Sequence, residues 1–302
     1  WRGLRQARPP AAILPPLPAA QPRNRLTLAR WLANPENPLP ARVTVNRLWE
    51  RFFGTGLVKT SEDLGRQGEL PSHPELLDWL ATEFLRLNGD FKMMQKRMVM
   101  SAAYRQATSV SGPMTEKDPF NRWLARGPRF RLDAEMIRDQ ALAVSGLLNR
   151  DLGGPSVFPE QPFNLWKEVG FLRPELGMDL WPTSEDRDRY RRGLYTFWRR
   201  IVTYPSFAVF DAPSREVCTS RRPRTNTPLQ ALTTLNDPVF LEAARGFAQR
   251  IMLEGGSDPA RQIDFAFRLC LARKPTQREQ QRLLDFYHQQ LRSFERDMNA
   301  AL

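Results

Sequence analysis

Helix-start signals recur along this chain of 302 residues, and they constrain its fold more than any other feature. Ser or Thr stands three residues before Glu or Gln at Ser72, Thr227 and Thr276, a spacing that predicts a capping box. Asp-Pro pairs at 237–238 and 258–259 predict two more helix starts, because proline favours the first helical position. Apolar residues at helical spacing follow these signals. The sequence therefore predicts a mainly α, multi-helical globular fold.

The first half of the chain adds further helical segments. Residues 39–53 carry an apolar face and stop at Gly54, a residue that commonly ends helices. A helical hairpin follows, with its short loop at residues 88–89. We also predict a short helix at residues 118–124 and a long one at residues 133–148.

The middle of the chain is less regular. Residues 151–190 are rich in proline and aromatic residues, which favours a long ordered loop over an idle linker. Residues 190–201 are compatible with a helix or a strand, and we favour a short β element or an extended piece. Residues 1–23, rich in Pro and Ala, predict an extended arm or linker. The remainder, residues 24–302, is predicted to be a single helical domain. It would consist of N-terminal helices at 24–150, an irregular insertion with a basic loop at 151–225, and C-terminal helices at 226–302.

Composition limits the function classes. Hydrophobic residues make up 41% of the chain, which is enough for a packed core. The net charge of +12 indicates an anionic partner or a generally basic surface. A nucleic acid is not favoured as that partner, because helix-turn-helix, zinc and RNA-recognition signatures are missing from the sequence.

Metal, haem and membrane signals are also missing from the sequence. Cys218 and Cys270 form neither a CxxC nor a CxxCH motif, so both a single disulfide and two free thiols remain open. The chain has only two histidines, which excludes a histidine-rich metal site. It contains neither a signal peptide nor an apolar run long enough to span a membrane.

Arginine is concentrated between residues 187 and 224, where ten arginines accompany three acidic residues. One interpretation is a surface that binds acidic glycans or other anions, because the planar guanidinium suits carboxylate, sulfate and phosphate groups. The alternative is that these arginines pair with nearby acids and hold a loop in place. The candidate ligand-binding residues are Arg129, Arg131, Arg138, Arg215, Arg221, Arg222, Arg224, Asn226 and Trp166.

Catalytic candidates are weak, and whether the chain is an enzyme stays open. Glu135 and Asp139 share a helix face and could form the acid–base pair that glycoside hydrolysis needs, or a patch of salt bridges. Asp211 and His73 are further candidates. We expect residues 129–139 to touch the loop at residues 211–226 and to form the candidate site with it.

Several motifs, in order, resemble a known family. Residues 24–31 read NRLTLARW, residues 41–53 read ARVTVNRLWERFF, and residues 224–240 read RTNTPLQALTTLNDPVF. Further motifs lie at residues 34–39, 54–60, 63–65, 71–80, 101–106, 131–146, 153–157 and 210–218. Together they resemble the domain of unknown function 1553, the PSD-one domain of planctomycete-type proteins.

This resemblance implies an exported, extracytoplasmic protein of which the chain is the C-terminal portion. Family members typically carry an upstream companion domain and often a cytochrome c-type module with a CxxCH motif. Because this chain has no CxxCH, the resemblance places haem on none of its residues, and no cofactor is expected here. The implied partners are the upstream domains and an acidic or complex glycan. The expected role is glycan-related binding or processing, with a structural domain that docks partner domains as the alternative.

Overall fold

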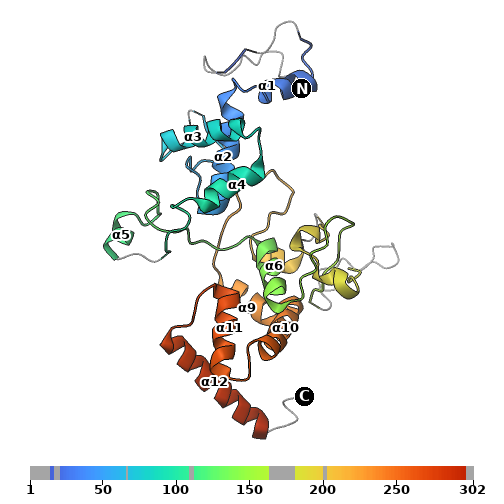
Figure 1. The fold of residues 1–302 in the computed structure, drawn as a ribbon. Coiled ribbons are helices and arrows are strands. Elements are labelled where there is room, and N and C mark those ends of the chain that lie inside the picture. The colour runs from blue at the N-terminus through green and yellow to red at the C-terminus, as the bar shows by residue number, and fades with distance from the viewer. Residues whose placement is uncertain are drawn as a thin grey trace. The chain divides into compact units, whose positions relative to one another are not determined.

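Helices dominate the computed structural model of the protein (Figure 1). The structure describes residues 14–16, 21–65, 67–108, 112–162, 181–199 and 203–296. Within these ranges no β-sheet forms, and two isolated parallel bridges join Asn149 to Arg191 and Val157 to Thr196. The predicted mainly α fold is therefore confirmed.

The contacts of the chain divide it into two compact units, Trp1–Arg131 and Leu132–Leu302. We call these the first and the second unit and describe each by itself. The sequence predicts subdivisions after residues 150 and 225 instead. The insertion at residues 151–225 falls within the second unit, because its side chains form a core with the helices on either side of it. A single domain over residues 24–302 stays a prediction.

In the first unit, most helix starts are fixed by short polar side chains. Asn24, Asn37 and Asp90 each accept a backbone N–H of the helix that follows. Gly54 ends α2 with a left-handed φ of 82°, as predicted. The described helices are α1 (Arg25–Leu32), α2 (Pro38–Phe53), α3 (Pro74–Arg86), α4 (Phe91–Met100) and α5 (Gly112–Lys117).

The core of the first unit lies where α2 packs against α3 and α4. Val45 and Met94 are fully buried at its centre. Asn46, also fully buried, accepts from the N–H of Val58 at 2.9 Å and donates to the carbonyl of Val58 at 3.0 Å. The Asn46 side chain of α2 thus fixes the backbone of the segment that follows the helix.

Two local predictions in the first unit are wrong. The predicted capping box at Ser72 does not form: α3 begins at Pro74 with His73 as its N-cap, and the hydroxyl of Ser72 donates to the carbonyl of Leu57 at 3.3 Å instead. Residues 118–124 form turns, not a helix.

The second unit contains the remaining described helices, drawn green to red in Figure 1. α6 packs against α8 and α10, and α10 packs in turn against α9 and α11. The α-helices are α6 (Ala134–Ser145), α8 (Pro205–Val209), α9 (Pro228–Asn236), α10 (Pro238–Glu254), α11 (Pro259–Leu271) and α12 (Gln277–Arg296). Two short 3-10 helices are η3 (Asp186–Tyr190) and η4 (Gly193–Tyr195). In the segment predicted as a short β element or an extended piece, residues 190–201, η4 lies between Arg191 and Thr196, which form the two isolated bridges.

Aromatic side chains from the irregular insertion form the core of the second unit. The rings of Trp181 and Tyr204 stack with centroids 5.7 Å apart, and Phe207 meets Tyr204 edge-on at 5.1 Å. All three are buried, against Ala134 of α6 and Phe240 of α10. The described parts of the insertion therefore belong to this core and position the start of α6. Residues 163–180 of the predicted long loop lie outside the residues that the structure describes.

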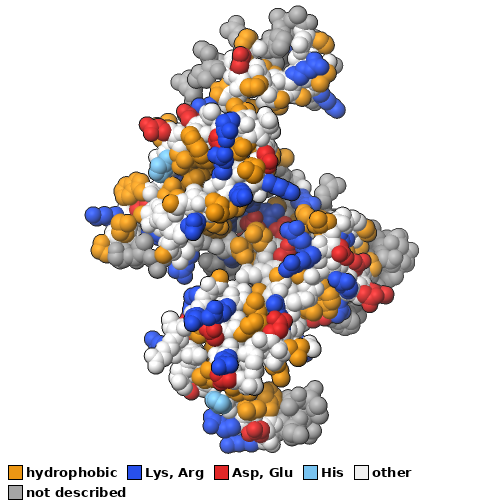
Figure 2. Space-filling model, in the orientation of Figure 1, with side chains coloured by type: hydrophobic (Ala, Val, Ile, Leu, Met, Phe, Trp, Pro, Cys, Tyr) orange, Lys and Arg blue, Asp and Glu red, His pale blue; other side chains and the backbone are white. Residues whose placement is uncertain are grey.

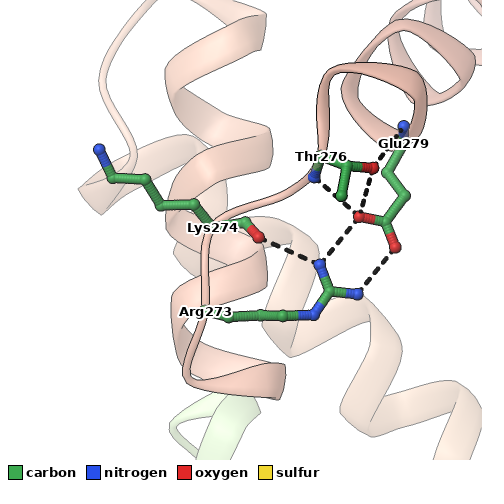
Figure 3. Close-up of polar contacts among 4 residues, drawn as sticks. All are labelled: Arg273, Lys274, Thr276 and Glu279. Atoms are coloured by element: carbon green, nitrogen blue, oxygen red, sulfur yellow. Dashed lines mark hydrogen bonds and ion pairs between the residues drawn. The ribbon is translucent and has the colours of Figure 1, made fainter. Parts of the chain in front are cut away.

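The predicted capping boxes of α9 and α12 are confirmed. The backbone N–H of Gln230 donates to Thr227, and the Gln230 side chain accepts from the N–H of Thr227. In the turn before α12, Glu279 accepts from the N–H of Thr276 and from Arg273 at 2.7 and 2.8 Å (Figure 3). The hydrogen bonds from Arg273 and Thr276 lower the pKa of Glu279 to about 2.

Candidate functional site

The loop at residues 211–226, which we call the Asp211 loop, is closed at its base. The carboxylate of Asp211 accepts the backbone N–H of Thr225 at 2.8 Å and the Thr225 hydroxyl at 2.9 Å. Gln230 of α9 donates to the Thr225 hydroxyl at 3.1 Å and to the carbonyl of Val209 at 3.0 Å. Asp211 has a left-handed φ of 62°, and this bonding offsets the cost of that conformation. The loop therefore leaves α8 and enters α9 in a fixed geometry.

The same loop is joined to the first turn of α6 by an ion pair. Arg222 donates to both carboxylate oxygens of Glu135, at 2.6 and 3.1 Å. Burial acts to raise the pKa of Glu135, but the hydrogen bond from Arg222, that from its own backbone N–H, and the nearby positive charges outweigh burial and lower it. The contact predicted between residues 129–139 and the Asp211 loop is thus present.

Asp139 and Arg138 of α6 point to other partners. Asp139 accepts the backbone N–H of Gly193 at 2.6 Å and Arg192 at 3.2 Å. Arg138 is only 2% exposed, and it donates to the carbonyl of Arg189 at 2.5 Å. Burial lowers the pKa of Arg138. These contacts favour the alternative of a salt-bridge patch, and an acid–base role for Glu135 and Asp139 stays a prediction.

Several arginines of the insertion are likewise held by internal partners. Arg189 donates to Glu242 of α10 at 2.6 Å, and the hydroxyl of Tyr190 donates to the same carboxylate oxygen at 2.6 Å. Arg191 is buried, donates to the carbonyl of Pro155 at 3.1 Å and also bonds to the carbonyl of Gly153. Much of the local positive charge therefore serves to fix the fold.

Other side chains of the Asp211 loop face outward. The guanidinium carbon of Arg215 lies 4.2 Å from the centroid of the Trp198 ring, and the indole N–H of Trp198 donates to the carbonyl of Ser214 at 3.4 Å. Arg221 and Asn226 are exposed. Arg224 lies 4.0 Å from Asp133, and this contact directs it toward α6.

The remaining candidates lie outside this site. Arg129, Arg131 and His73 belong to the first unit. A ring nitrogen of His73 lies 3.0 Å from the hydroxyl of the neighbouring Ser72. Among the described residues, no other serine and no cysteine is hydrogen-bonded to His73. Trp166 lies outside the residues that the structure describes.

Arg126 and Phe120 were not among the candidate site residues predicted from the sequence. Both line a cavity in the first unit together with Arg129. A signal was present, because residues 119–131 contain four arginines and no acidic residue. The cavity itself requires the fold, since its other wall comes from residues 53–55.

Basic side chains do not gather in a single patch on the face drawn in Figure 2, where they lie among acidic and apolar ones. In the part of the chain that the structure describes, no group of three or more His, Cys, Asp or Glu side chains could hold a metal ion. Within the same residues, no helix is long and apolar enough to cross a membrane. Cys218 is exposed and Cys270 half-buried, and both are free thiols.

A family model described as a protein of unknown function (DUF1553), and named PSD1, matches residues 24–287. The chain belongs to this DUF1553 family. Neither the curated proteins nor the solved structures contain a match to it.

Proposed function

We propose that this chain binds sulfated or otherwise acidic polysaccharides on the outer face of the Asp211 loop. The observation that carries the proposal is the guanidinium of Arg215, held 4.2 Å from the centroid of the Trp198 ring in a loop closed by Asp211 and Thr225. An arginine positioned in this way loses little conformational freedom when it binds an anion. Arg221 and Asn226 add exposed donors on the same loop.

Binding is better supported than catalysis. Glu135 is bonded to Arg222 through both oxygens, which lowers its pKa and disfavours proton donation near neutral pH. Asp139 accepts from Gly193 and Arg192. The resemblance to exported proteins supports an extracytoplasmic location for the binding role, as an accessory to an upstream cytochrome c-type module.

The test is affinity electrophoresis of the whole chain in gels that contain dextran sulfate or neutral dextran. We expect the wild type to be retarded by dextran sulfate alone, and less so as salt rises. The double variant Arg215→Gln/Arg221→Gln should lose most of this retardation. Arg278→Gln/Arg282→Gln, which removes two exposed arginines from α12, is the control of equal charge and should keep more of it.

Two results would contradict the proposal. Equal retardation of the two double variants would mean that net charge alone drives binding. Retardation by double-stranded DNA equal to that by dextran sulfate would indicate a general affinity for polyanions, as in the nucleic-acid alternative.

A second candidate function, docking on a companion domain, is supported by α11 and α12. Neither helix contains a buried residue, although both are strongly amphipathic. Large apolar side chains of α12 are 39–57% exposed, namely Leu283, Phe286, Tyr287, Leu291 and Phe294. Figure 2 shows apolar side chains on the surface where α12 lies.

The docking candidate predicts that Phe286→Ser/Leu291→Ser abolishes co-purification with the upstream domains of the parent protein. Helix content, measured by circular dichroism, should be kept, because neither side chain is buried. Unchanged co-purification would remove α12 from the interface.

A further inference from the structure

A cavity of about 390 Å³ lies in the first unit, between the end of α2 and the loop at residues 118–130, which we call the Asp118 loop. Its lining includes the rings of Phe53, Phe120 and Phe130 and the side chains of Arg126 and Arg129. Its volume is within the range typical of small-molecule sites.

Hydrogen bonds fix the start of the Asp118 loop. Asp118, only 6% exposed, accepts the backbone N–H groups of Arg122 and Trp123, each at 2.8 Å. Asn121 and Leu124 have left-handed φ angles of 51° and 57°, which are uncommon for residues other than glycine. The loop is therefore held in a conformation that it would not adopt by local preference.

Further bonds tie the loop to its surroundings. The Asn121 side chain donates to the carbonyl of Arg126 at 2.8 Å and accepts its N–H at 3.2 Å. Arg122 donates to the carbonyls of Gly56 and Leu57 at 3.0 and 3.2 Å. Gly127 also fits closely, because a Cβ there would lie 2.4 Å from the carbonyl oxygen of Gln106. The cavity wall is thus formed before any ligand arrives.

The charge along this wall is not compensated by neighbouring carboxylates. Among the described residues that line the cavity, none is acidic. Arg126 donates through Nη2 to the carbonyl of Pro119 at 2.7 Å, whereas its Nη1 is buried and has no hydrogen-bond acceptor among the described residues. Arg129 is exposed, and no hydrogen bond or ion pair of its side chain occurs among the described residues.

We propose that this cavity binds the carboxylate and ring of a uronic acid residue. The carboxylate would be held by Arg129, with the positive charge of Arg126 on the same wall, since guanidinium groups bind carboxylates in a planar, often bidentate geometry. Phe120 is 83% exposed and offers its ring face to the sugar. Apart from the rings of Pro119 and Pro128, the described lining contains no Ala, Val, Leu, Ile or Met side chain, which favours a sugar ring over an aliphatic peptide side chain. The site shares no residue with the Asp211 loop, so it goes beyond the function proposed above.

The test is calorimetric titration of the whole chain with a trisaccharide of galacturonic acid and with its methyl ester, which lacks the charge. We expect the acid to bind and the ester to bind at least about tenfold more weakly. Arg129→Gln should weaken binding of the acid by about tenfold or more, and Phe120→Ala by several-fold. Arg47→Gln, which removes an exposed arginine of α2, should leave binding unchanged. Thermal unfolding of each variant checks that it is folded.

Several outcomes would overturn the inference. These are no binding by the folded wild type, equal binding of acid and ester, or wild-type affinity in Arg129→Gln. Equal affinity for a short peptide through its terminal carboxylate would overturn the choice of a sugar. The double variant Arg215→Gln/Arg221→Gln separates the two proposals. If this variant loses trisaccharide binding while Arg129→Gln keeps it, the inference about the cavity is contradicted and the polysaccharide proposal is not.

Discussion

The Asp118 loop and the Asp211 loop are built on one plan but leave their arginines in different states. Each begins with an aspartate that accepts backbone N–H groups from later in the loop. Each also contains two residues other than glycine with left-handed φ angles. In the Asp211 loop, Arg222 is neutralised by Glu135, whereas in the Asp118 loop Arg122 and Arg126 donate to backbone carbonyls.

The difference shows that the number of arginines in a loop does not measure its capacity to bind anions. A carboxylate partner neutralises the arginine and so lowers its attraction for a further anion. A carbonyl partner holds the guanidinium in place but does not neutralise its charge. The Asp211 loop is the more conspicuous in sequence. The Asp118 loop keeps more uncompensated charge beside a cavity, and the following changes test that contrast.

The largest expected effect is on the Asp118 loop. Asp118→Ala removes a buried carboxylate and leaves two backbone N–H groups without their acceptor. We expect a loss of about 2–3 kcal/mol in the free energy of unfolding, measured by urea denaturation. Asp211→Ala, at a more exposed position, should cost about 1 kcal/mol. Equal costs would remove the distinction between the buried base of the Asp118 loop and the half-buried base of the Asp211 loop.

The ion pair of the Asp211 loop ranks next. Glu135→Gln and Arg222→Gln should each cost about 1.5–2.5 kcal/mol, because the bonds are charge-assisted and the side chains are 20% and 23% exposed. A double-mutant cycle should give a coupling energy of about 1–2 kcal/mol. Coupling near zero would mean that Arg222 is as available to ligands as Arg215.

The pH dependence of that pair is smaller and has a definite sign. The pKa of Glu135 is lower in the folded chain than its ordinary value of 4.5, so the pair stabilises the protein fully above that pH. Its contribution is lost as the pH falls below 4.5 and through the folded pKa. The stability difference between wild type and Glu135→Gln should therefore shrink from pH 6 to pH 3. A constant difference over that range would show that the charge of Glu135 is not what stabilises the loop.

The smallest effect on stability is expected for the outward arginines. Arg215→Gln and Arg221→Gln should each change the free energy of unfolding by no more than about 0.5 kcal/mol, since both side chains are exposed. Their affinity for dextran sulfate should fall nevertheless. A stability loss as large as that of Arg222→Gln would assign them a structural role instead.

Local signals in the sequence predicted local structure well. The caps at Thr227 and Thr276 formed as expected, because donor and acceptor lie within one helical turn. The same signal failed at Ser72, whose hydroxyl bonds to Leu57, a partner 15 residues earlier. The helix predicted at residues 118–124 failed because Asp118 binds two N–H groups in a turn that includes left-handed residues.

The candidate site was predictable in part. The sequence left two alternatives open for the arginines of the basic loop, anion binding and internal salt bridges. The pairing of Arg222 with Glu135 is an example of the second. The partners of Arg138 could not be predicted, because its acceptor is the backbone carbonyl of Arg189, which carries no residue-specific signal. The same holds for Arg126, whose acceptor is the carbonyl of Pro119.

Arginine-selective modification with phenylglyoxal, read by peptide mass spectrometry, tests the central claim most directly: that exposed arginines without a carboxylate partner among the described residues are the ones that bind acidic sugars. We expect Arg129, Arg215 and Arg221 to react rapidly in the free chain and slowly in the presence of galacturonate oligosaccharides or dextran sulfate. Arg122, Arg138 and Arg222 should react slowly in both states, because internal acceptors hold them. Rapid modification of Arg222, or no protection of the first three by either ligand, would contradict the claim.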